Sequence, residues 1–136
     1  MCIFCDIIKS PENHRAVTDE TGDVYGIYDG FPVTKGHMLF IPKRHVSSFF
    51  GLTKEECTDT MMLLHKWASI LSEDDPTITG FNIGWNCGDS AGQTIDHAHA
   101  HLIPRRNDDC ENPIGGVRHC ACNGKGYYGK GDLDGV

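Results

Sequence analysis

Three histidines at every second position are the strongest chemical signal in the sequence. His97, His99 and His101 stand in the run "TIDHAHAHLIP", which alternates like a β-strand. Because alternate side chains of a strand face the same way, we expect the imidazoles on one face, with neighbours roughly 6.5 to 7 Å apart. The residues between and after them should face the core: Ala98, Ala100 and Leu102. Imidazoles so arranged can bind a metal or attack a substrate, and the spacing alone does not separate these roles.

A second chemical motif lies near the start of the sequence. Cys2 and Cys5 form a CxxC pair, a spacing that lets two thiolates bind one zinc ion. The pair is half of a tetrahedral site, and histidines are the natural remaining ligands. A cytidine-deaminase site would need His-x-Glu and Pro-Cys-x-x-Cys, and neither is present. A redox dithiol would be expected within a thioredoxin-like βαβ pattern, which is also absent.

The loop "NCGDSAGQT", residues 86–94, is rich in neutral hydrogen-bond donors. Gly88 and Gly92 make backbone NH groups accessible, and Asn86, Gln93 and Thr94 add polar side chains. Such a set can hold phosphate oxygens without net positive charge. Next to the histidines, the loop therefore indicates a phosphate-binding site.

These motifs need elements to position them, and hydrophobic periodicity predicts an α+β fold with an antiparallel sheet. Thr53 and Glu56 form a capping-box pattern at the start of the clearest helix. The helices are expected over residues 2–9 and 53–71, and the strands over 22–29, 37–42, 80–86 and 94–104.

Length and composition bound the remaining possibilities. The 136 residues predict one domain, with a core over 1–106 and an irregular or partly mobile C-terminal extension over 107–136. The formal charge of −7 argues against binding a nucleic-acid polymer. Seven cysteines, an odd number, favour thiols and metal ligands over a disulfide framework. Without a signal-peptide pattern or a run of roughly 18 apolar residues, we expect a cytoplasmic protein that does not bind a membrane.

Together the motifs resemble the signature of the histidine triad (HIT) family. "HAHAHLIP" preceded by "GQT" carries the resemblance, which extends to "CIFCDII", "GIYDGFPVTKGHMLFIPKRH" and "GWNCGDSAGQT" and covers nearly all of residues 2–106. The ending "HLIPRR…GGVR" looks most like the diadenosine-polyphosphate-hydrolase-like branch. The resemblance implies a homodimer with an antiparallel sheet, one long helix and a short N-terminal helix.

The resemblance also implies a nucleotide hydrolase that acts at the α-phosphate of dinucleoside polyphosphates or related conjugates, with an adenine nucleotide as the expected substrate. His99 would be the nucleophile that forms a nucleotidyl-histidine intermediate, and His101 would lie near the phosphate and the leaving group. Asp29 would bind ribose hydroxyls and His37 would line the site. The residues that match the family's phosphate-binding positions are Asn86, Gln93 and Thr94.

Zinc-bearing members of the family imply a structural Zn²⁺ held by Cys2, Cys5, His45 and His97. All four positions would be filled by protein, as in structural rather than catalytic zinc sites. His97 and His99 would then have different roles although they stand two residues apart.

Other functions remain open at this stage. The same residues would serve a nucleoside phosphoramidate hydrolase or a nucleotidyl transferase, because the bond that breaks is defined by what leaves. A non-enzymatic nucleotide-binding adaptor would keep the same fold, and a metalloenzyme would place zinc on all three triad histidines. In the extension, "HCAC" lacks the usual zinc-site spacing, so we expect exposed thiols rather than a second metal site at Cys110, Cys120, Cys122 and His119.

Overall fold

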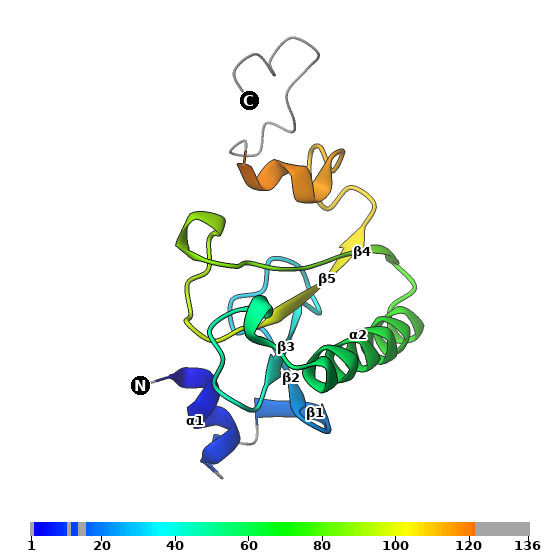
Figure 1. The fold of residues 1–136 in the computed structure, drawn as a ribbon. Helices are drawn as coiled ribbons and strands as arrows, with labels where there is room; N and C mark the ends of the chain where they lie inside the picture. Colours follow the sequence, from blue (N-terminus) through cyan, green and yellow to red (C-terminus); the bar gives the residue numbers. More distant parts are fainter. Residues whose placement is uncertain (1, 11, 14–15, 122–136) are drawn as a thin grey trace, which may run out of the picture.

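The computed structural model describes residues 2–10, 12–13 and 16–121 (Figure 1). Within these residues a five-stranded sheet is accompanied by two α-helices and short 3-10 turns. In chain order the helices and strands are α1 (Ile3–Lys9), β1 (Val17–Thr21), β2 (Val24–Tyr28), β3 (Met38–Pro42), α2 (Lys54–Asp74), β4 (Ile78–Trp85) and β5 (Ala100–Arg106). The 3-10 turns are η2 (Phe49–Gly51), η3 (Asp89–Ala91) and η4 (Gly116–Ala121).

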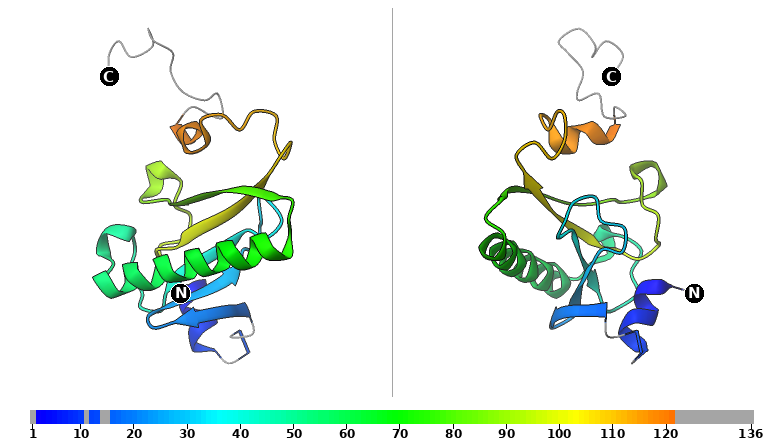
Figure 2. Two further views of the ribbon diagram at one scale, coloured as in Figure 1. Left: turned by 90° about the vertical axis from the view of Figure 1, so that its right-hand side faces the viewer. Right: turned by 180° about the vertical axis from the view of Figure 1, so that it is seen from behind.

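All neighbouring strands of the sheet are antiparallel, in the order β1-β2-β3-β5-β4. The last strand in sequence, β5, therefore lies between β3 and β4. Figure 2 shows α2 across one face of the sheet and α1 against the other. The expected α+β fold with an antiparallel sheet is confirmed.

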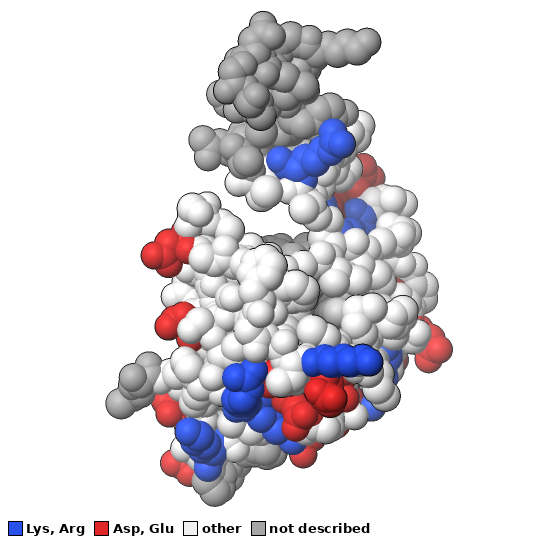
Figure 3. All heavy atoms as spheres, viewed as in Figure 1, with Lys and Arg blue, Asp and Glu red and all other residues white. Residues whose placement is uncertain are grey.

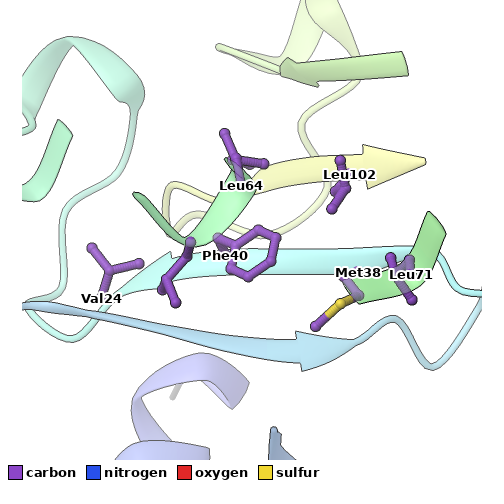
Figure 4. Close-up of a cluster of buried hydrophobic side chains, with 8 residues drawn as sticks. Val24, Met38, Phe40, Leu64, Leu71 and Leu102 are labelled. Atoms are coloured by element: carbon purple, nitrogen blue, oxygen red, sulfur yellow. The ribbon is translucent and has the colours of Figure 1, made fainter. Parts of the chain in front are cut away.

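The main core fills the space between the sheet and α2 (Figure 4). Buried apolar side chains from three strands meet leucines of the helix, and excluding this apolar surface from water stabilises the fold. The labelled members of the cluster are Val24, Met38, Phe40, Leu64, Leu71 and Leu102. The core thus holds β5 rigidly behind the histidines.

The start of α2 is fixed by the predicted capping box. Thr53 Oγ1 accepts from the Glu56 backbone NH at 3.1 Å, and the Glu56 carboxylate accepts from the Thr53 NH at 2.8 Å. The helix buries Leu63, Leu64 and Leu71, whereas Met61 is 55% exposed. Among the described residues no helix is long and apolar enough to cross a bilayer.

The helix α1 packs on the other face of the sheet through a second apolar cluster. Phe4 lies against Tyr25, Ile27 and Leu39, and the Tyr25 hydroxyl donates to the Phe4 carbonyl at 2.6 Å. Burial raises the pKa of Tyr25 well above its usual range, so the hydroxyl stays protonated and donates. This anchoring places the CxxC pair against the sheet.

The strand predicted over 94–104 begins too early, because β5 starts only at Ala100. The preceding segment, residues 95–99, does not pair with a neighbouring strand. Instead the Ala98 NH donates to the Val46 carbonyl, in the loop after β3, at 2.7 Å. The prediction that the alternate residues face the core is confirmed by the burial of Ala98, Ala100 and Leu102.

The sequence patterns also missed β1, because the polar sequence "VTDET" carries almost no apolar signal. This edge strand is only half-buried, and it contributes one paired edge to β2. Its absence from the prediction does not affect the site, which lies at β3 and β5.

The segment after β5 turns back and ends in η4 beside the β4 side of the sheet (Figure 1). Arg105 holds the turn, since its guanidinium donates to both Asp109 carboxylate oxygens at 2.8 and 2.7 Å and to Asn82 Oδ1 at 2.6 Å. Residues 122–136 lie outside the described residues, and Cys122 is one of them. The division at residue 106 therefore stays a prediction.

Candidate active site and metal centre

The three triad histidines divide into two groups. His97 is fully buried, and its ring lies 4.9 Å from that of His45. The rings of His99 and His101 lie 5.2 Å apart, toward β5. Phe4 contacts the rings of both His97 and His99, with centroid distances of 5.7 and 5.2 Å. One side chain of α1 therefore supports two adjacent sites.

The first group is a cluster of possible metal ligands. Nε2 of His97 donates to the Pro42 carbonyl at 2.7 Å, since a carbonyl can only accept, so Nδ1 keeps its lone pair. That Nδ1 lies 3.4 Å from Cys2 Sγ and 3.6 Å from Cys5 Sγ. His45 Nδ1 lies 3.3 Å from Cys5 Sγ, and all four ligand atoms are within 4.8 Å of one another.

These distances fit a tetrahedral metal site. With metal–sulfur and metal–nitrogen bonds of zinc length, the nitrogen and sulfur ligands of a tetrahedron lie about 3.5 Å apart. Burial raises the pKa of the Cys5 thiol and lowers the pKa of His97. A cation bound among them would favour the thiolate and the neutral imidazole, which are the ligand forms.

The nucleophile predicted from the triad, His99, has a defined tautomer. Its Nδ1 lies 2.8 Å from the His97 carbonyl and must carry the proton that this hydrogen bond requires. In the neutral imidazole the lone pair is therefore on Nε2. The residue is 7% exposed, so the ring is held in a closed environment with its reactive nitrogen fixed.

The third triad histidine belongs to a chain of polar groups. The Val33 NH donates to His37 Nδ1 at 3.2 Å, so His37 carries its proton on Nε2. This Nε2 donates to His101 Nδ1 at 2.9 Å and also lies 3.4 Å from the Asp29 carboxylate. His101 must then carry its own proton on Nε2.

This Nε2 of His101 is a buried donor without a hydrogen-bond partner in the described part of the chain. Such groups are rare in folded proteins and are frequent where a ligand supplies the partner. Burial, aided by His99 and His37, lowers the pKa of His101 to about 4, and burial also lowers the pKa of His37. Both imidazoles are therefore neutral at pH 7.

The loop over 86–94 is shaped by Gln93. Its Nε2 donates to the carbonyls of Ser47 and Ile95 at 2.6 and 3.0 Å, and its Oε1 accepts from the Gly88 NH at 2.9 Å. Both ends of the amide are therefore engaged within the protein. Gly88 and Gly92 have φ of +92° and +88°, a conformation that favours glycine.

The structure places the three predicted phosphate-binding side chains beside two different hollows. Asn86 lines a cleft of about 490 Å³ together with His37 and His101. Thr94 and Gln93 border a different hollow, which Ser47 and Ser48 also line. The large cleft was missed from the sequence because its walls come from distant segments, including the segment after β5.

Comparison with known proteins decides the family. Residues 10–108, well over half of the chain, match the family model described as HIT domain. The chain is a HIT-domain protein.

Its HIT relatives include enzymes and a metal-bound structure. The adenosine 5'-monophosphoramidase HNT1 of Candida albicans is 34% identical over 110 residues, covering 79% of this chain and 72% of that protein. A bis(5'-adenosyl)-triphosphatase of Dictyostelium discoideum is 41% identical over 81 residues, covering 60% and 54%. A zinc-bound histidine triad protein of Mycobacterium smegmatis superposes with a TM-score of 0.71 at 34% identity, covering 79% of this chain and 77% of that one.

Proposed function

We propose that this HIT protein hydrolyses adenine nucleotide conjugates at the α-phosphate through a nucleotidyl-His99 intermediate. The observation that carries the proposal is the free Nε2 of His99 beside the buried, unpaired Nε2–H donor of His101. Relatives named as a phosphoramidase and as a dinucleoside triphosphatase support this class of reaction. Dinucleoside polyphosphates and nucleoside phosphoramidates are the two substrate classes in question.

In the first step the lone pair of His99 Nε2 forms a bond to the α-phosphorus. The bond from phosphorus to the leaving atom breaks, and its electron pair stays on that atom. A polyphosphate leaves as an anion, whereas an amine nitrogen takes up a proton from water. Neutral imidazole is nucleophilic near pH 7 and needs no separate activating base.

In the second step water attacks the phosphorus, and the nitrogen–phosphorus bond breaks with its electron pair returning to Nε2. The attacking water gives up its proton to solvent, so the two steps together consume one water molecule. Throughout both steps His99 keeps its proton on Nδ1, which donates to the His97 carbonyl. The intermediate is therefore a cationic imidazolium, which departs more readily from phosphorus than a neutral ring.

His101 assists by donating a hydrogen bond rather than a proton. With a pKa lowered to about 4 it is neutral at pH 7, and His37 fixes the tautomer that places hydrogen on Nε2. A preoriented donor in a buried site stabilises charge that develops on the phosphate or the leaving atom. We assign His37 a positioning role through this hydrogen bond.

The remaining substrate contacts belong to the same proposal. We assign ribose hydroxyls to Asp29 and phosphate oxygens to Asn86 and Thr94, because the NH groups of Gly88, Gly92 and Gln93 donate within the loop. Because both ends of its amide are engaged, Gln93 acts by holding the loop in shape.

The metal site is proposed to hold a structural Zn²⁺ bound by Cys2, Cys5, His45 and His97. The interatomic distances fit tetrahedral zinc, and the zinc-bound relative supports the same metal. Zinc bound here would tie α1 to the segment that carries His99 and would take no part in the reaction. Within the described residues the ligand atoms of His97, His99 and His101 do not gather into one group, which disfavours a three-histidine metal centre.

A homodimer and a cytoplasmic location complete the proposal. β4 is an edge strand with Ile83 49% exposed, and α2 exposes Met61 and Met62, so apolar surface is available for a second copy. Light scattering would measure the mass. A reducing compartment such as the cytoplasm suits the zinc site, which needs thiolates rather than a disulfide.

The test of the reaction uses adenosine 5'-phosphoramidate and diadenosine triphosphate as substrates. We expect AMP release from at least one of them, and quenched protein should carry one AMP unit on the peptide that contains His99. His99→Ala should abolish both signals, while His65→Ala, at an exposed α2 histidine, should leave them unchanged. Tight AMP binding without turnover of either substrate would instead identify a non-enzymatic binding protein.

A further inference from the structure

The cleft beside His101 has a wall from outside the HIT domain match. That match ends at residue 108, whereas Cys110, Val117 and Cys120 all line the cleft. The opposite side is formed by β4 and β5 and by the loop that carries Val33. In Figure 3 the molecule is hollowed below the C-terminal segment, and the surface around the hollow is mainly uncharged.

The position of the cleft relative to His99 indicates which part of a substrate it receives. His37 and His101 line the cleft, whereas His99 does not. In an in-line displacement at phosphorus the leaving group departs on the side opposite the nucleophile. Since the cleft lies on the His101 side and away from His99, it lies where an in-line attack by His99 would direct the leaving group.

The lining of the cleft is apolar where it is exposed. Val33 and Val117 are 69% and 67% exposed, and both line it together with Ile103, which stands on the same face of β5 as His101. Exposed apolar side chains gathered around one hollow commonly mark a binding surface. An apolar substituent placed there would cover these side chains and remove them from water.

The charges of the cleft are already paired. Among the described lining residues Arg105 is the one lysine or arginine, and it is bonded to Asp109 and Asn82. These bonds from Arg105 hold the pKa of Asp109 well below its usual range. A polyphosphate chain entering the cleft would therefore meet a neutralised arginine and apolar side chains.

We propose that this cleft is the leaving-group subsite, that it selects an uncharged apolar substituent, and that Val117 is a specificity-determining residue. The inference rests on the proposed function and deepens it, because it favours nucleoside phosphoramidates with an apolar amine over dinucleoside polyphosphates. The phosphorus–nitrogen bond breaks as described above, with the electron pair passing to the amine nitrogen and the proton coming from water.

The experiment compares kcat/KM for three substrates: the N-benzyl amidate of AMP, the unsubstituted amidate of AMP, and diadenosine triphosphate. The variants are Val117→Asp, Val117→Lys and Ile114→Asp. Ile114 is the matched control, because it lies in the same segment and is equally exposed at 69% but does not line the cleft. Variant effects are compared substrate by substrate, so intrinsic differences in leaving-group reactivity cancel.

Val117→Asp should lower kcat/KM for the benzyl amidate about tenfold, the size of a modest change in an apolar specificity pocket. The unsubstituted amidate should change by less than about twofold, on the same scale. Val117→Lys should also reduce turnover of the benzyl amidate and should raise kcat/KM for diadenosine triphosphate at low salt. Ile114→Asp should leave all three substrates unchanged.

Three results would overturn the inference while leaving the proposed function standing. The first is an equal loss of kcat/KM on both amidates in Val117→Asp. The second is a selective loss on the benzyl amidate in the control variant Ile114→Asp. The third is wild-type turnover of diadenosine triphosphate with neither amidate hydrolysed. Failure of the wild-type protein on all three substrates would reject the proposed function itself.

Discussion

Replacing His37 tests how the site controls the tautomer of His101. In the structure His37 Nε2–H donates to His101 Nδ1 at 2.9 Å, and the Val33 NH fixes the tautomer of His37 in turn. His37→Ala removes the donor and leaves His101 Nδ1 as a buried acceptor without its partner. Because either ring nitrogen can then carry the proton, the Nε2–H donor is no longer guaranteed. We expect kcat to fall while the fold is retained.

The magnitude follows from the hydrogen bond that is lost. A buried polar group deprived of its partner costs about 1 to 3 kcal/mol. If this energy cost raises the transition state, in which His101 donates a hydrogen bond, kcat falls by roughly 5- to 150-fold. His37→Gln keeps an amide NH near the position of the ring Nε2, so it should recover most of the loss.

The assay combines steady-state kinetics with nitrogen-15 NMR of the histidine rings. Wild-type protein and His37→Gln should show His101 protonated at Nε2, and His37→Ala should show a mixture or the other tautomer. If His37→Ala kept both the wild-type kcat and a single Nε2–H signal for His101, the positioning role would be refuted. Equal losses in the Ala and Gln variants would also contradict it.

Three further predictions concern acidification, metal and packing. The pKa of His101 is about 4 in the folded protein, against an ordinary value of 6.5. Between these values the unfolded chain binds more protons than the folded protein, so stability falls as the pH drops. The Tm of His101→Gln should therefore decline less between pH 7 and 5 than the Tm of wild type. Cys5→Ser should contain no bound zinc when measured by elemental analysis. At free zinc near 1,000 times Kd, this loss should lower the free energy of unfolding by about 4 kcal/mol, or the Tm by roughly 10 to 20 °C. An unchanged zinc content would rule out the assigned ligands. Gly26→Ala should destabilise by about 1 to 3 kcal/mol in urea unfolding, because its Cβ would lie 2.7 Å from Phe40 Cε1. Gly80→Ala, whose Cβ would have open space, is the matched control.

The parts of the fold that local chemistry determines were predictable from the sequence. The capping box at Thr53 and Glu56 marks the start of α2, because both partners stand within one helical turn. The start of β5 was not predictable, since it depends on the Ala98 NH bonding to the Val46 carbonyl in a distant loop. Hydrophobic periodicity predicts which side chains are buried, but it does not predict which backbone groups form hydrogen bonds with one another.

The site shows the same limit. Spacing identifies the triad and the CxxC pair, but it does not pair Cys2 with His97, which stands 95 residues away. The tautomers depend on backbone groups, the Pro42 carbonyl for His97 and the His97 carbonyl for His99, and residue types carry no information about these. The cleft wall at Val117 is equally invisible, because it forms only when the segment after β5 returns across the sheet.

The sequence separation of the metal ligands has a consequence for the order of folding. Cys2 and Cys5 leave the ribosome before His97, which follows more than 90 residues later. Two thiolates alone fill half of a tetrahedral shell, so the ion cannot complete its coordination until the chain has closed this long loop. Metal capture is therefore a late event, which locks a finished fold rather than nucleating it. Until then the two thiols depend on the reducing power of their surroundings.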